Sequence, residues 1–123
     1  MLEAVDHVQV SIPRGGEAEA RRFYGALLGL TEKPKPPALA ARGGCWFERG
    51  LVKVHCGVEE PFSAARKAHI AFRVDDLADL AARSRAAGFE PLPDDDLPGF
   101  ARIYLPDPFG NRLEFLQPIG PES

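Results

Sequence analysis

The chain of 123 residues has few of the features that mark several large classes of protein. Its only cysteines are Cys45 and Cys56, and neither belongs to a CxxC or Cys/His pattern. A disulfide framework and a thiolate zinc site are therefore not indicated, and we expect buried thiols. No lysine and arginine cluster accompanies the net charge of −3, which argues against nucleic acid as a partner. No apolar run approaches the roughly 20 residues needed to span a bilayer.

The remaining composition is that of an ordinary globular protein. Apolar residues make up 45% of the chain and charged residues 27%, which is typical of soluble domains. A length of 123 residues suits one compact domain. The acidic start, Met1-Leu2-Glu3, lacks the basic region of a signal peptide, so we expect a cytoplasmic protein without a membrane anchor.

The first half of the chain predicts a strand, a helix and a hairpin. Residues 6–12 alternate apolar and polar side chains, as a half-buried strand does. Residues 17–28 have apolar side chains at helical spacing, and Gly29 follows in the position of a left-handed cap. The three prolines within residues 33–37 predict an extended segment or loop. Residues 45–57 then form a predicted hairpin.

The second half predicts the same order of elements. It comprises a strand at 68–74, a helix from an Asp75 or Asp76 cap to Gly88, a strand at 89–92 and a hairpin at 102–117. The sequence therefore predicts a single α+β domain, 1–123, of two βαβββ modules, about 1–57 and 68–118, joined by a connector at 58–67. We expect their sheets to form an open cup with the helices outside. Residues 120–123 are expected to form a frayed tail.

The hairpin at 102–117 carries the first candidate site residue. Asp107-Pro108-Phe109-Gly110-Asn111 favours a turn between two strands. Because strand side chains alternate, Glu114 lies on the polar face of the second strand. A carboxylate is thus held on a rigid element.

The three histidines of the chain occupy related positions. His7 and His69 begin equivalent strands of the two modules, and aligning the final hairpin arms places His55 opposite Glu114. If the polar faces curve around one hollow, these four side chains converge. Imidazole and carboxylate together suit a divalent first-row metal. Three or four protein ligands would leave positions open for water or substrate, as a catalytic metal requires.

Several motifs together resemble one known superfamily. They are Asp6-His7-Val8, Phe23-Tyr24, Leu28-Gly29-Leu30, His69 with Val74-Asp75-Asp76, and Asp107-Pro108-Phe109-Gly110-Asn111 with Glu114. With them the chain resembles the vicinal oxygen chelate superfamily, which includes glyoxalases, fosfomycin-resistance proteins, bleomycin-resistance proteins and extradiol dioxygenases. The resemblance covers nearly the whole chain and implies the glyoxalase/bleomycin resistance/dioxygenase fold.

The resemblance also implies roles for individual residues. It makes His7, His69 and Glu114 ligands of a divalent ion such as Zn, Ni, Mn or Fe. His55 lies near the place where glyoxalase I has a glutamate, so Glu114 is the carboxylate left to act as a base, with His55 as a second catalytic candidate. The presence of His55 near the place of that glutamate argues against a close copy of glyoxalase I.

Two classes of function remain open from the sequence. The first is a small metal-dependent enzyme with lyase/isomerase, thiol transferase or dioxygenase chemistry, acting on a small oxygen-chelating substrate. The alternative is a metal-free bleomycin-resistance-type protein that sequesters a small molecule. Tyr104 is available for ring-cleaving chemistry. The candidate cations for an anionic substrate are Lys53, Arg73, Arg102 and Arg112.

The connector at 58–67 suggests how the modules assemble. A short connector favours modules placed side by side, which cannot readily face each other. We therefore expect a homodimer with sites shared between subunits, each built from His7 and His55 of one subunit and His69 and Glu114 of the other. The resemblance to small glyoxalase-type dimers implies the same assembly.

Overall fold

The computed structural model describes residues 1–120 and divides the chain into two compact units. Unit 1 is Met1–Ala65 and unit 2 begins at Arg66, so the boundary falls within the expected connector. Whether the two units make up one domain stays a prediction. Of the tail expected at 120–123, all but Gly120 lies outside the described residues. Across residues 1–120, no helix is long and apolar enough to cross a membrane.

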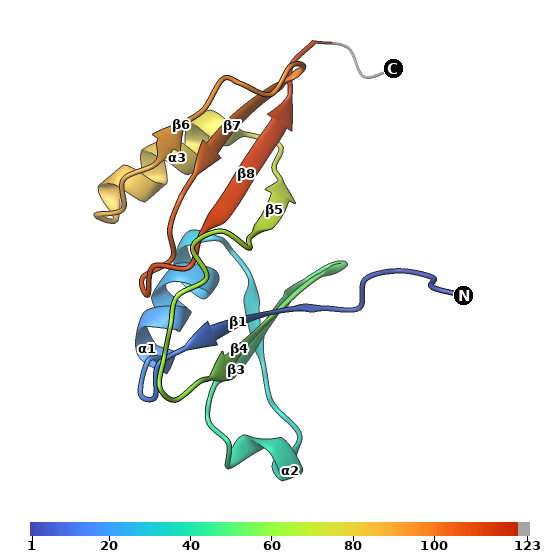
Figure 1. Ribbon diagram of the computed structural model, residues 1–123, viewed down its shortest axis with the longest axis vertical. Coiled ribbons are helices and arrows are strands. Elements are labelled where there is room, and N and C mark those ends of the chain that lie inside the picture. The colour runs from blue at the N-terminus through green and yellow to red at the C-terminus, as the bar shows by residue number, and fades with distance from the viewer. Residues whose placement is uncertain (121–123) are drawn as a thin grey trace. The chain divides into compact units, whose positions relative to one another are not determined.

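Unit 1 contains one four-stranded sheet with the strand order β1-β4-β3-β2 (Figure 1). Its elements are β1 (Val8–Ile12), α1 (Glu17–Ala20), η1 (Arg21–Leu27), β2 (Thr31–Lys33), α2 (Pro37–Ala40), β3 (Cys45–Arg49) and β4 (Val52–Val58). The predicted hairpin is present as β3 and β4, which pair antiparallel. Cys45 and Cys56 face each other across it as buried thiols.

Unit 2 contains a second four-stranded sheet with the equivalent order, β5-β8-β7-β6 (Figure 1). Its elements are β5 (Ile70–Arg73), α3 (Leu77–Ala86), β6 (Leu92–Pro93), β7 (Phe100–Tyr104) and β8 (Leu113–Pro118). The predicted cap is Asp76, whose side chain accepts a hydrogen bond from the backbone N–H of Asp79 at 3.0 Å. The α+β class with two βαβββ modules is thus confirmed.

Strand register shows which positions of the two modules are equivalent. In unit 1, the parallel strands β1 and β4 align Val8 with Val54, and in unit 2, β5 and β8 align Ile70 with Leu113. The next residue of β4 is His55 and the next residue of β8 is Glu114, so these two occupy equivalent positions. His7 and His69 each lie one residue before their strand rather than within it.

The helix predicted at residues 17–28 is present, but most of it, η1, is a π-helix rather than an α-helix. Leu28 donates its backbone N–H to the carbonyl of Phe23, five residues earlier, at 2.9 Å. A five-residue step of this kind defines a π-helix. The buried side chains are Ala20, Phe23, Tyr24 and Leu27. Gly29 adopts a φ of 78°, the predicted left-handed cap.

Two short elements differ from expectation. A helical turn, α2, begins at Pro37, where residues 33–37 predicted only an extended segment or loop. Proline is well tolerated in a first helical turn because its missing N–H has no partner there. The strand expected at 89–92 is only β6, because Phe89 donates its N–H to the carbonyl of Ser84 and so completes the end of α3.

Each unit buries one face of its sheet against its own helix. In unit 1, the ring of Tyr24 in η1 lies 6.0 Å from that of Phe47 in β3. In unit 2, α3 contacts β7 and β8 and buries Leu77 and Leu80 (Figure 1). Side chains alternate between the two faces of a strand. The face of each sheet that points away from its helix therefore carries His55 in unit 1 and Glu114 in unit 2.

Candidate functional site

In unit 1 the candidate residues are held in a stack of aromatic rings. The ring of His55 lies between those of His7, at 4.1 Å between centroids, and Trp46, at 4.0 Å. The indole and imidazole planes of Trp46 and His55 differ by only 5°. Burial lowers the pKa of His55, and the neighbouring His7 lowers it further. The neutral form of His55, which has a lone pair for a ligand, is therefore favoured.

His7 is oriented by the residue before it. Its Nδ1 lies 2.9 Å from Oδ2 of Asp6. The pKa of Asp6 is lowered chiefly by this hydrogen bond, so the carboxylate is ionised and accepts a hydrogen bond from the Nδ1–H group. The Nε2 atom of His7 is left to bind a ligand. A histidine that binds a metal commonly donates its other N–H to a carboxylate or carbonyl in this way.

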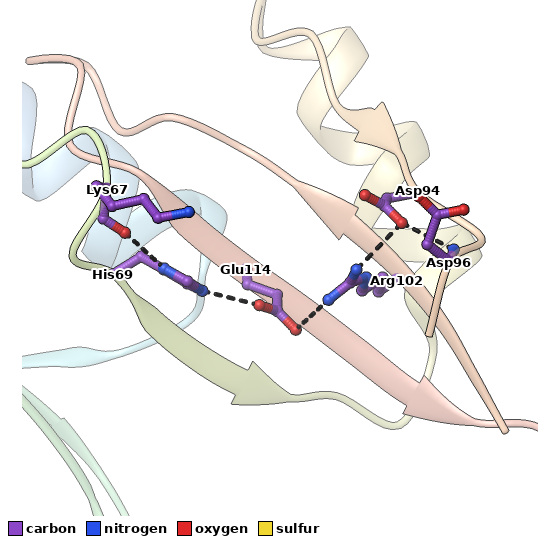
Figure 2. A network of polar contacts seen from close by, with 6 residues as sticks. All are labelled: Lys67, His69, Asp94, Asp96, Arg102 and Glu114. Carbon is purple, nitrogen blue, oxygen red and sulfur yellow. Dashed lines mark hydrogen bonds and ion pairs between the residues drawn. The ribbon is translucent and has the colours of Figure 1, made fainter. Parts of the chain in front are cut away.

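In unit 2 the other two candidates contact each other directly. Nε2 of His69 lies 2.9 Å from Oε1 of Glu114, and Nδ1 of His69 lies 2.9 Å from the backbone carbonyl of Lys67 (Figure 2). The side chain of Glu114 is only 8% exposed, whereas that of His69 is 28% exposed. The sequence placed Glu114 correctly on the polar face, but this carboxylate is buried among partners.

The second oxygen of Glu114 faces an arginine. Nη1 of Arg102 lies 3.4 Å from Oε2 of Glu114, and Nη2 of Arg102 donates to Asp94 at 3.1 Å (Figure 2). Asp94 in turn accepts a hydrogen bond from the backbone N–H of Asp96 at 2.8 Å. Arg102 is thereby anchored on β7, opposite the strand that carries Glu114. The network orients the carboxylate, with one oxygen toward Arg102 and the other toward His69.

The donor set fits a divalent metal. A carbonyl oxygen can only accept, so Nδ1 of His69 donates to Lys67. Nε2 of His69 then faces a carboxylate oxygen at 2.9 Å, and two lone pairs repel at that distance unless a proton or a metal ion lies between them. Imidazole nitrogen with carboxylate oxygen is a common ligand combination for zinc, nickel and iron. Within residues 1–120 no group of three or more His, Cys, Asp or Glu side chains is placed to hold a metal ion.

Trp46 is the residue that sequence reasoning missed in unit 1. Strand β3 places it directly across from His55. The sequence contains the information needed to find Trp46, because a two-residue turn after Arg49 implies that Trp46 pairs with His55. Lys53, a sequence candidate, is paired across the same hairpin with Glu48.

The remaining sequence candidates lie in unit 2. The ring of Tyr104 lies edge-on to His69, with centroids 5.9 Å apart. Arg102 and Arg112 place their guanidinium groups over the Tyr104 ring at 5.3 and 4.1 Å. Arg73 lies over Phe100 at 5.9 Å. Of these three arginines, Arg102 is the one that forms an ion pair with Glu114 within residues 1–120.

Comparison with solved structures identifies proteins of the same fold. A protein from Bacillus anthracis whose name places it in the glyoxalase family is 44% identical, with a TM-score of 0.92 over 96% of this chain and 97% of that one. The fosfomycin resistance protein FosX from Listeria monocytogenes is 15% identical, with a TM-score of 0.76 over 95% and 94%. A glyoxalase/dioxygenase from Nostoc punctiforme is 21% identical, with a TM-score of 0.75 over 97% and 92%.

A family model gives the same result over most of the sequence. No curated protein matches the chain. The model of the Glyoxalase/Bleomycin resistance protein/Dioxygenase superfamily matches residues 4–115, which include His7, His55, His69 and Glu114. The chain therefore belongs to the Glyoxalase/Bleomycin resistance protein/Dioxygenase superfamily.

Proposed function

We propose that this protein is a metal-dependent enzyme that acts on a small molecule with two adjacent oxygen atoms. One observation carries the proposal: the two repeat-equivalent histidines, His7 and His69, each have Nδ1 held by an oxygen acceptor and Nε2 directed away from it. A histidine that serves only in packing does not need this orientation, whereas a metal ligand does. His7, His55, His69 and Glu114 are the proposed ligands.

Each residue has a role that follows from its surroundings. A divalent ion bound here would polarise the substrate oxygens as a Lewis acid. Glu114 is the base, because its side chain is the carboxylate of the proposed set and Arg102 keeps it oriented. The lowered pKa of His55 keeps its ring neutral, and His55 serves as a ligand or a second base.

The four ligands come as two pairs on two compact units, so a complete site needs a unit 1 and a unit 2 to face each other. We propose that a homodimer supplies them, with His7 and His55 from one subunit and His69 and Glu114 from the other. Two-fold symmetry would then give two sites per dimer.

The metal content of purified protein tests the proposal. We expect about one zinc, nickel, manganese or iron ion per subunit after expression without added metal, and loss of it in His69→Ala. Lys67→Ala is the matched control, because it retains the carbonyl that holds Nδ1 of His69. Elemental analysis of the three proteins measures the result. Equal metal content in His69→Ala and wild type, or none in wild type, would favour the metal-free binding protein instead.

A further inference from the structure

Unit 2 contains a pocket whose lining includes Tyr104, a neighbour of His69 and Glu114, and to which the proposed function has so far assigned no role. Its volume is about 340 Å³, and it is lined by Arg66, Leu92, Tyr104, Pro106, Gly110 and Arg112. Pockets of roughly 300 Å³ and above are large enough for small-molecule ligands. All six residues belong to unit 2.

Arg112 is positioned in this pocket without a carboxylate partner. Its guanidinium lies 4.1 Å from the centroid of the Tyr104 ring, a cation–π contact that leaves its N–H donors unused. No hydrogen bond or ion pair of Arg112 occurs among the described residues. Arg102, on the same ring, is instead compensated by Asp94 at 3.1 Å and Glu114 at 3.4 Å. Arg112 is thus a half-buried cation that no carboxylate of the described residues contacts directly, although Asp94 attracts it over a longer distance.

The other residues of the pocket indicate which kind of ligand it would bind. Arg66 adds a second guanidinium, and no described residue forms an ion pair with it either. Leu92, Pro106 and the ring of Tyr104 supply apolar walls. A guanidinium fork matches the oxygens of a carboxylate or a phosphoryl group. The complementary ligand has one oxyanion head and a small apolar body.

Tyr104 connects this pocket to the proposed metal ligands. It pairs across the hairpin with Glu114, and its ring lies 5.9 Å from that of His69. Tyr104 therefore borders both the pocket and this pair of side chains. We propose that the pocket binds the oxyanion group of the substrate, through Arg112 first and Arg66 second, and so selects small apolar oxyanions. The role as a substrate site depends on the proposed function, whereas the binding of an anion does not.

Calorimetric titration with four aromatic probes tests the inference. Benzoate and phenylphosphonate carry the two kinds of oxyanion head, and benzamide and benzyl alcohol are neutral molecules of similar size. We expect the protein to bind at least one anion in the millimolar range or tighter, and about ten-fold more tightly than the neutral probes. The stronger of the two anions identifies the head group.

Matched variants assign the binding to this pocket. Arg112→Met retains the aliphatic stem and should weaken anion binding about ten-fold, while Arg112→Lys should lose less. Arg85→Met removes the same charge from an exposed position on α3 and should bind the anion as wild type does. Circular dichroism of each variant verifies that it is folded.

The outcomes separate this inference from the metal proposal. Equal binding of anionic and neutral probes, no saturable anion binding, or unchanged binding by folded Arg112→Met would each overturn the pocket assignment. Titrations after removal of metal with EDTA should still show the anion bound. Anion binding by a protein that never takes up metal would leave the pocket in place and refute the metal function alone.

Discussion

Glu114 has two different neighbours, one on each carboxylate oxygen. His69 contacts Oε1 at 2.9 Å and Arg102 faces Oε2 at 3.4 Å. The contact with the arginine restricts the rotation of the carboxylate, so Oε1 is the oxygen that faces His69. His55 lies at the equivalent strand position of unit 1, but its neighbours are the two rings of His7 and Trp46.

The first residue-scale prediction compares these two equivalent positions. Glu114→Gln should weaken zinc binding by about a hundred-fold or more, because it removes a charged ligand. His55→Ala should weaken it by only about ten-fold, because water can occupy a vacated position. Zinc titrations against a competing chelator measure both constants. A larger loss of zinc affinity in His55→Ala than in Glu114→Gln would make His55 the principal ligand and Glu114 a residue that only orients His69.

At the scale of elements, the β7–β8 hairpin aligns Glu114 with Tyr104. Its turn is organised by Asp107, which is 4% exposed. Oδ1 of Asp107 accepts hydrogen bonds from the backbone N–H groups of Phe109 and Asn111, both at 2.9 Å, and Oδ2 accepts one from the Asn111 side chain at 2.9 Å. A side chain of this kind replaces backbone partners inside a tight turn.

Removal of that side chain should therefore destabilise unit 2. Asp107→Ala leaves buried donors without partners, and we expect the free energy of unfolding to fall by about 3 kcal/mol. Urea denaturation followed by circular dichroism measures the change. Asp95→Ala, an exposed acid in the preceding loop, is the control and should change stability by less than about 0.5 kcal/mol. A loss below about 1 kcal/mol for Asp107→Ala would show that the turn is held by its backbone alone.

At the scale of the whole molecule, the proposed ligands fall into two pairs that belong to different compact units. Unit 1 carries His7 and His55, and unit 2 carries His69 and Glu114. A lesion in one unit therefore damages only the sites to which that unit contributes. The proposed dimer can be tested by combining lesions.

Mixed subunits should recover one site. A heterodimer of His7→Ala with Glu114→Gln has both lesions in one shared site, so the other site is intact and should bind about one metal ion per dimer. The control mixes His69→Ala with Glu114→Gln, whose lesions lie in the same unit and damage both sites. Differential tags isolate the heterodimers, and elemental analysis counts the metal. Failure of the first mixture to regain metal, with exchange verified, would place each site within a single chain.

Much of the architecture followed from local patterns in the sequence. Alternating side chains located the strands that begin after His7 and His69, Asp76 capped a helix as predicted, and Gly29 took the left-handed conformation. Alignment of the second arms of the two predicted hairpins also places His55 opposite Glu114, in agreement with the strand register. These features depend on near neighbours along the chain and on the two-residue period of strands, which a sequence displays directly.

Tertiary structure alone decided which side chains touch. Cross-strand register and side-chain rotamers set the stacking of Trp46 on His55, the contact of Arg102 with both Asp94 and Glu114, and the cation–π contact of Arg112 with Tyr104. The π-helical hydrogen bonding of η1 is likewise not indicated by the spacing of its apolar residues in the sequence. The sequence by itself determined the residues available for a metal and an anion, whereas packing across strands decided their partners, because those contacts join residues far apart in the chain.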